Sequence, residues 1–206
     1  MAKEIEIKYQ TNKVIEVVNP PVKYSNFYVS DTSEGYYLVV LRLEYYKKVD
    51  IVIDAFNELG LPLIIVGSGS KENELKVRAK SNVIFKKGLS NEEIAKLYSK
   101  ANAFIFPQKE DYGITPLEAN ASGIPVIAYG QGGVLETMIP HNGANANQST
   151  AVFFHQQTAD SLVEAIIKTQ TISFDKRFIR AHAEKFAEKY FMEKIDRLIH
   201  SKYNHA

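Results

Sequence analysis

Short apolar runs recur between residues 36 and 155, and amphipathic segments separate them. The runs are continuous and rich in β-branched or aromatic residues: 36–41, 62–67, 82–86, 103–107, 125–130 and 151–154. Continuous rather than alternating apolarity is typical of strands that are buried on both faces, as in a parallel sheet. Parallel strands need a crossover between them, so the pattern predicts an α/β protein with a doubly wound parallel sheet of about six strands.

The segments between the runs have helical periodicity. Apolar residues repeat on one face of the first segment at Val49, Val52, Ile53, Phe56 and Leu59. Another helix is predicted after Ser90, because Glu93 follows at the spacing of a capping box. Residues 158–204 are predicted to be helical, first from a cap at Thr158 and then in a second stretch from Phe174.

Three parts are predicted along the 206 residues. Residues 1–35 contain Asn19-Pro20-Pro21, which disfavours a helix or a central strand, so we interpret this stretch as an incoming connector. Residues 36–172 form the sheet domain. Residues 173–206 form a helical arm, which is longer than the sheet needs for cover.

Composition excludes several classes of function. Twenty-five Lys and Arg against 24 Asp and Glu leave a net charge of +1, which does not predict nucleic-acid binding. The absence of cysteine excludes disulfide scaffolds and thiol nucleophiles. No apolar run approaches the roughly 18 residues of a membrane span, and the first ten residues are too charged for a signal peptide. We therefore expect a cytoplasmic protein.

Ligands of open α/β sheets bind beyond the carboxyl ends of the strands, so residues at these positions are candidate site residues. After the first run come Arg42 and Lys47, five residues apart. A guanidinium and an ammonium group at one strand end could converge on a phosphate. The alternative is a solvated basic loop.

The stretch after the fourth run is the most informative. Pro116 suits a first helical turn, so a helix is predicted to begin between Gly113 and Thr115. The backbone N–H groups of residues 113–115, together with the helix dipole, would bind an anion. Glu110 precedes this helix and Glu118 lies about one turn inside it, so two carboxylates flank the predicted anion site. The alternative places both on the surface.

Glycines follow two other runs. Gly67 begins a sequence similar to a dinucleotide fingerprint, but Glu72 occupies the position of its third glycine, which disfavours nicotinamide-dependent redox chemistry. Gly132 and Gly133 precede a predicted helix and could offer backbone amides to a ligand. No phosphate-binding P-loop, HExxH or Asp-x-Asp motif is found, and no metal site is predicted.

Together these segments resemble the C-terminal, nucleotide-sugar-binding domain of GT-B-fold glycosyltransferases of the retaining family 4 (group 1). Residues 36–69 are similar to the family's first βαβ unit. The sequence EDYGITPLE has its Glu-x7-Glu pattern, and NASGIPVIAYGQGGVLE is similar to the segment that follows it. The resemblance runs from about Val17 to the C-terminus and is closest to mannosyltransferase-like members of surface-polysaccharide pathways. It implies a Rossmann-like domain that is one half of a GT-B fold.

The resemblance also implies roles for the candidate residues. Arg42 and Lys47 would neutralise the diphosphate of a GDP- or UDP-sugar, in place of a metal. The amides of Gly113, Ile114 and Thr115 would continue this site to the sugar. Glu110 would contact the sugar hydroxyls and Glu118 the ribose, and the base would lie near residues 86–89. The remaining candidate substrate-binding residues are Gly67, Lys87, Gly132 and Gly133.

The sequence also departs from the family. Leu41 stands where the family usually has glycine, and only residues 1–12 resemble the N-terminal, acceptor-binding domain, namely its last helix. We therefore expect a domain that is incomplete for catalysis alone. A glycan or lipid-linked acceptor, and contact with the inner membrane, would depend on the other domain. The alternative is a non-catalytic binding or scaffolding module that forms a homodimer through the C-terminal arm.

Overall fold

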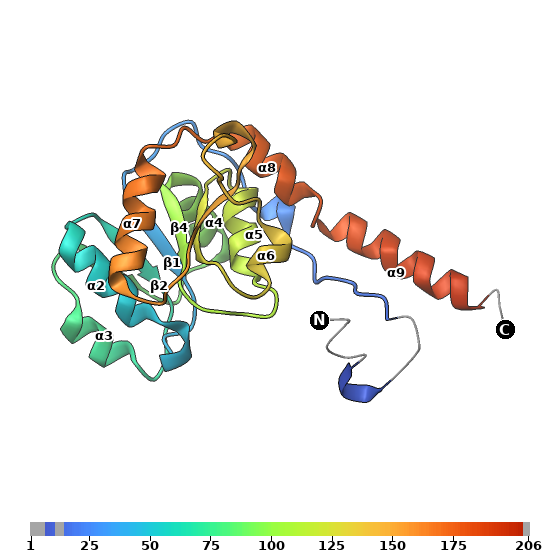
Figure 1. The fold of residues 1–206 in the computed structure, drawn as a ribbon, viewed down its shortest axis with the longest axis horizontal. Coiled ribbons are helices and arrows are strands. Elements are labelled where there is room, and N and C mark those ends of the chain that lie inside the picture. Colours follow the sequence, from blue (N-terminus) through green and yellow to red (C-terminus); the bar gives the residue numbers. More distant parts are fainter. Residues whose placement is uncertain (1–6, 11–14, 204–206) are drawn as a thin grey trace.

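The computed structural model describes residues 7–10 and 15–203, and its centre is one six-stranded sheet (Figure 1). The strands are β1 (Tyr37–Val40), β2 (Leu63–Val66), β3 (Val83–Lys86), β4 (Ala103–Phe106), β5 (Val126–Tyr129) and β6 (Ala151–Phe154). Their spatial order is β3-β2-β1-β4-β5-β6, and every neighbouring pair is parallel. The predicted fold is confirmed, because all six apolar runs contain a strand.

Helices follow the strands and cover the sheet. They are α2 (Val49–Leu59), α3 (Glu72–Arg78), α4 (Asn91–Lys100), α5 (Ile114–Ala121), α6 (Val134–Thr137), α7 (Ala159–Gln170), α8 (Lys176–Glu184) and α9 (Glu188–Tyr203). Short 3-10 turns occur as η1 (Tyr24–Asn26), η2 (Tyr45–Lys47) and η3 (Ala146–Gln148).

Both faces of the sheet are buried along β1, β2, β4, β5 and β6, which explains the continuous apolarity of these strands. The edge strand β3 is the exception to the prediction, because Ile84 on it is 53% exposed. Alternate side chains point to opposite faces. Leu38 and Phe104 pack in one hydrophobic core with residues of α4 and α5. Val39 and Ile105 pack in a second core with residues of α2 and α7. A strand with a core on each side has no solvated face and therefore no polar alternation.

The predicted helix starts agree with the observed ones. Ser90 and Glu93 form the complete capping box of α4, and the Thr158 side chain accepts a hydrogen bond from the Ser161 amide at the start of α7. Helix α5 begins at Ile114, within the predicted range of Gly113 to Thr115, and Gly113 is its N-cap residue. These signals are local, which is why the sequence locates them well.

The helical stretch predicted from Phe174 onward is two helices, not one. Helix α8 ends at Glu184, and α9 begins at Glu188. Between them, the Phe186 carbonyl accepts a hydrogen bond from the Val22 amide at 2.9 Å, and Val22 forms a parallel β-bridge with Ala187. The connector therefore occupies backbone groups that a continuous helix would pair internally, and the helix is interrupted.

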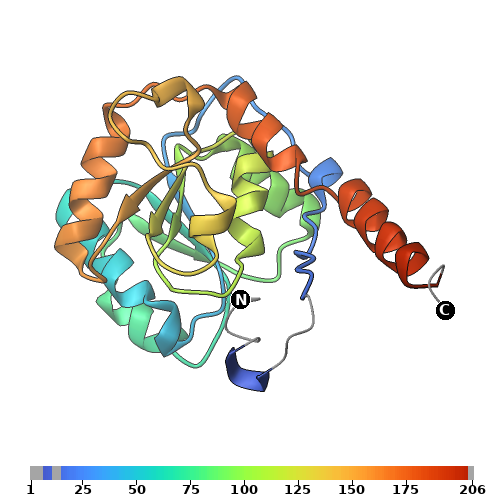
Figure 2. The ribbon, with the colours of Figure 1, turned by 45° about the vertical axis from the view of Figure 1, so that its right-hand side comes forward.

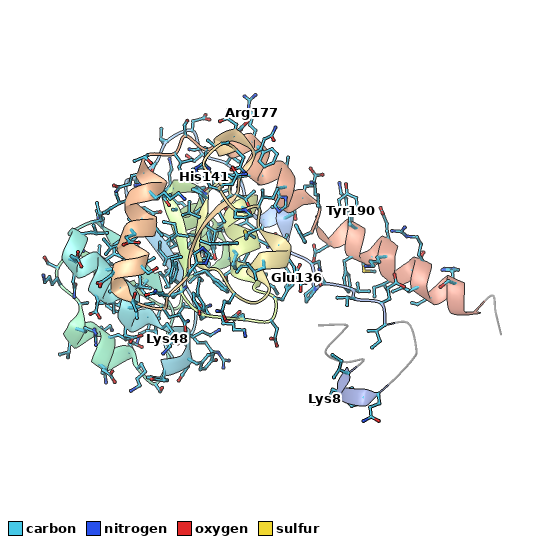
Figure 3. The ribbon with its side chains drawn as sticks, in the orientation of Figure 1. Lys8, Lys48, Glu136, His141, Arg177 and Tyr190 are labelled. Carbon is cyan, nitrogen blue, oxygen red and sulfur yellow. The ribbon has the colours of Figure 1, made fainter. Side chains whose placement is uncertain are left out.

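Helix α8 packs against α5, whereas α9 extends away from the sheet (Figures 1 and 2). Tyr190, near the start of α9, lies outside the body of the molecule (Figure 3), and Phe178, Phe186 and Phe191 are half-buried. The expected helical remnant at residues 1–12 lies mostly outside the described residues. Across the described ranges, every helix is too short or too polar to serve as a membrane span.

Candidate functional site

The strand order changes direction between β1 and β4, and a cavity of about 660 Å³ opens beyond the carboxyl ends of these two strands. This is the topological switch point at which open α/β sheets bind their ligands. The cavity is lined by Pro20, Val40, Leu41, Tyr46, Lys47, Gln108, Lys109, Glu110, Asp111, Tyr112, Gly113, Ile114 and Thr115. Five predicted site residues are therefore together: Lys47, Glu110, Gly113, Ile114 and Thr115.

Lys47 and Glu110 form an ion pair across the switch point. Lys47 follows β1 and Glu110 follows β4, and their side chains are 15% and 29% exposed. The Glu110 Oε1 atom also accepts a hydrogen bond from Gln108 Nε2 at 3.1 Å. Partial burial reduces the screening of such a pair by water, so the two charges hold each other at the edge of the cavity.

The start of α5 supplies positive potential without a charged side chain. No side chain caps this helix in the part of the chain that the structure describes, and Gly113 occupies the N-cap position. The free N–H groups of Ile114 and Thr115 border the cavity, which both residues line. Free amides and the positive end of the helix dipole favour an anion at this position.

Glu118 lies one turn further along α5 and does not line this cavity. Its Oε2 atom accepts a hydrogen bond from the hydroxyl of Tyr98 on α4, at 3.1 Å. Burial raises the pKa of the Glu118 carboxyl, and the hydrogen bond from Tyr98 lowers it in part. The alternative reading of Glu118 as an exposed helix residue does not hold, because the side chain is half-buried.

Glu118→Gln is expected to stabilise the fold at neutral pH. A carboxyl group whose pKa is raised by folding contributes stability below its unfolded pKa and loses it as the pH rises through its folded pKa. Glutamine does not ionise, so the variant does not lose this stability as the pH rises. It should therefore unfold about 1–4 °C higher than the wild type at pH 7. The difference should shrink toward pH 4 in thermal melts followed by circular dichroism. Glu58→Gln, at an exposed position on α2, is the neutral control, and a lower midpoint for Glu118→Gln at pH 7 would contradict the prediction.

Two predicted cations lie outside the cavity lining. Arg42 is exposed, two residues beyond the end of β1. Lys87 is also exposed, and its Nζ atom is 3.0 Å from Glu72 Oε1 at the start of α3.

Gly67 and Gly132 permit close approach between loops. A Cβ atom on Gly67 would lie 1.8 Å from the Leu41 carbonyl oxygen, and one on Gly132 would lie 2.3 Å from the Glu110 carbonyl oxygen. The neighbouring Gly133 amide donates a hydrogen bond to that same Glu110 oxygen at 2.8 Å. The structure thus gives these glycines a scaffold role, and the Gly133 amide predicted as a ligand donor is already paired.

The family model of the glycosyl transferases group 1 matches residues 23–201. The chain belongs to this family. It is 33% identical over 102 residues to an O-antigen chain mannosyltransferase of Escherichia coli. This match covers 46% of this chain and 28% of that protein. It is 27% identical to an alpha-monoglucosyldiacylglycerol synthase of Streptococcus pneumoniae, over 81% of this chain and 40% of that protein. The matched segments span less than half the length of these relatives.

Solved GT-B glycosyltransferases share the fold at low sequence identity. A pneumococcal O-GlcNAc transferase solved with UDP and GlcNAc superimposes with a TM-score of 0.73 at 21% identity. The match covers 96% of this chain and 42% of that chain. The group 1 glycosyltransferase domain therefore has the α/β fold that its sequence predicts.

The structure adds residues to the candidate site of this group 1 domain that the sequence did not identify. Gln108 is the second residue after β4 and is 1% exposed, so its position just beyond a strand end could have identified it. Tyr46 lines the cavity from η2, and Tyr112 lines it from the loop before α5. Burial, followed by the charge of Glu136, raises the pKa of Tyr112 to about 12, so its hydroxyl stays protonated at neutral pH.

Within the described residues, no group of three His, Asp or Glu side chains is arranged to share a metal ion.

Glu72, whose position disfavoured a dinucleotide fingerprint, is the first residue of α3. Its carboxylate binds Lys76 Nζ at 2.7 Å as well as Lys87.

Proposed function

We propose that this domain binds the nucleotide-diphosphate sugar, a GDP- or UDP-sugar, in a retaining and metal-independent transfer of a hexosyl group. The observation that carries the proposal is the Lys47–Glu110 pair beside the uncapped start of α5, all in one cavity at the switch point. A cation and free amides bind a diphosphate, and a carboxylate accepts hydrogen bonds from sugar hydroxyls.

The proposed roles follow from the positions of the groups. The Lys47 ammonium and the amides of Ile114 and Thr115 bind the diphosphate, and the exposed Arg42 guanidinium reaches it from the end of β1. Glu110 accepts hydrogen bonds from the sugar, and Glu118 accepts them from the ribose. A diphosphate held by fixed cations and amides needs no metal ion to neutralise it.

The same groups would stabilise the transition state. As the bond between the anomeric carbon and the phosphate oxygen breaks, negative charge grows on the departing nucleoside diphosphate. The acceptor oxygen bonds to the anomeric carbon, and its hydroxyl proton passes to the departing phosphate. The Lys47 ammonium and the start of α5 are aimed at this charge. Preorganised positive groups of this kind lower the barrier because they need little reorganisation during the reaction.

Relatives support the choice of sugar and acceptor. One relative is named as a mannosyltransferase of an O-antigen chain and another as a glucosyldiacylglycerol synthase. We therefore propose mannosyl as the first sugar to test and a glycan or lipid-linked alcohol as the acceptor, in surface-polysaccharide synthesis. Binding of the acceptor, and any association with a membrane surface, would require a further domain.

A calorimetric panel of GDP, UDP and their hexose conjugates, each measured with EDTA and with Mg²⁺, tests the proposal. One nucleoside diphosphate should bind with a Kd between about 1 µM and 1 mM in both conditions. Arg42→Ala and Glu118→Ala should each weaken this binding. Absence of binding by every compound, with no ligand-dependent thermal shift, would overturn the proposal.

A second candidate function is a non-catalytic scaffold that dimerises through the C-terminal arm. The observation that favours it is the exposure of apolar side chains on α9, with Tyr190, Met192 and Ile199 at 43%, 61% and 49% exposed. Light scattering that shows a dimer, together with no nucleotide binding, would favour this candidate. A monomer that binds a nucleoside diphosphate would exclude it.

A further inference from the structure

Tyr98 lies at the centre of the core between the sheet and helix α4. Its side chain is 0% exposed, and its ring packs 5.5 Å from that of Phe27 and 5.4 Å from that of Phe104. Phe27 lies in the connector and Phe104 in β4, so the ring is held from two sides. Contacts this close leave the tyrosine little freedom to change rotamer.

The only polar atom of this side chain binds a carboxylate. The Tyr98 hydroxyl donates its hydrogen bond to Glu118 Oε2 at 3.1 Å. Among the described residues, the other oxygen of Glu118, Oε1, accepts no hydrogen bond. One oxygen of the carboxylate is therefore held by a rigid donor, while the other has no hydrogen-bond donor among the described residues.

We propose that Tyr98 is the positioning residue for the Glu118 carboxylate, holding Oε2 so that Oε1 is presented to the ribose of the donor nucleotide. This inference rests on the proposed function, in which Glu118 accepts hydrogen bonds from the ribose. It assigns a role to a core residue 20 positions away in the sequence and on another helix.

Two physical effects make such a residue useful. A glutamate side chain loses rotamer freedom when it binds a ligand, and a pre-existing hydrogen bond reduces that loss. A buried carboxylate is also destabilised in its ionised form, and a phenol donor offsets part of that cost. Burial raises the pKa of Tyr98 well above its ordinary value, so the hydroxyl remains a donor throughout the physiological range.

Tyr98→Phe removes the donor and keeps the ring. We expect it to weaken binding of GDP or UDP, whichever the wild type binds, by about 5- to 20-fold in calorimetry. In a Glu118→Gln background the same change should weaken binding by less than about 2-fold, because the group that Tyr98 positions is already altered. Weak complexes in this cycle can be measured by ligand-observed NMR.

Tyr36→Phe is the matched control. Tyr36 is also buried, and its hydroxyl donates to the Leu97 carbonyl oxygen of α4 at 2.8 Å, so its loss costs the fold one comparable hydrogen bond. It should leave nucleotide binding unchanged. One buried hydrogen bond is a small part of a domain's stability, so both variants should fold.

Equal weakening by Tyr98→Phe in the wild-type and Glu118→Gln backgrounds would overturn the inference, since it indicates a purely structural role. So would an equal loss in Tyr36→Phe. Failure of the proposed function is distinguishable, because the wild-type protein would then bind neither GDP nor UDP.

Discussion

Lys47→Ala is expected to weaken binding of the nucleoside diphosphate by about 10- to 100-fold, because it removes a partly buried cation from the phosphate site. Calorimetry with GDP and UDP measures this change. Lys48→Gly is the matched control: it removes one positive charge from the same loop, but Lys48 does not line the cavity. Its φ of 55° is one that glycine adopts freely, so this substitution does not strain the backbone.

Glu110→Gln should have the opposite effect on the nucleoside diphosphate. The Lys47 ammonium is paired with Glu110, so a diphosphate must compete with this carboxylate for it. Without the carboxylate charge, GDP or UDP should bind up to about 5-fold more tightly. The additional affinity of the sugar conjugate should fall, because the sugar loses its acceptor. Weakening of the nucleoside diphosphate by Glu110→Gln as large as that in Lys47→Ala would contradict this account of the pair.

Gly132→Ala is expected to destabilise the fold by about 2–5 kcal/mol and to abolish most nucleotide binding. The residue has a φ of 78°, which costs an alanine about 1–2 kcal/mol. Its new Cβ would lie 2.3 Å from the Glu110 carbonyl oxygen, so the loop that carries Glu110 must move. Overpacking of this kind adds about 1–3 kcal/mol. Urea unfolding measures the stability change.

Gly35→Ala separates the two contributions. Gly35 has a similar φ of 81°, but a Cβ there would meet no atom within 4 Å. The Gly35→Ala variant should lose only the conformational contribution to its free energy of unfolding, about 1–2 kcal/mol, and should keep its nucleotide affinity. An equal loss of stability in both variants would show that the contact with the Glu110 loop has no energetic consequence.

Helix starts and buried strands could be predicted because their signals are local. The Ser90–Glu93 capping box and the apolar run of β4 each lie within a few residues. The break between α8 and α9 could not be predicted in this way. It depends on Val22, a residue of the connector that is far from residues 186–187 in the sequence but bonds to them in the fold.

In the candidate site too, local sequence identified single residues but not the contacts between them. The rule about strand ends identified Lys47 and Glu110 separately, and the Glu-x7-Glu spacing identified Glu118. That Lys47 binds Glu110, 63 positions away, is a consequence of β1 and β4 being neighbours in the sheet. The glycines are a further example. Their positions after the strands could be read from the sequence, but the backbone groups that they approach, those of Leu41 and Glu110, could not.

By itself, the sequence determined the α/β class, the six strands and the start of α5, because short-range burial patterns, capping groups and backbone preferences decide these. Only the tertiary structure decided which charged and polar groups meet. The strand order brings Lys47 to Glu110, and packing of α4 on α5 brings Tyr98 to Glu118. Such pairings depend on the spatial order of segments that are distant in the sequence, and short-range sequence patterns do not determine that order.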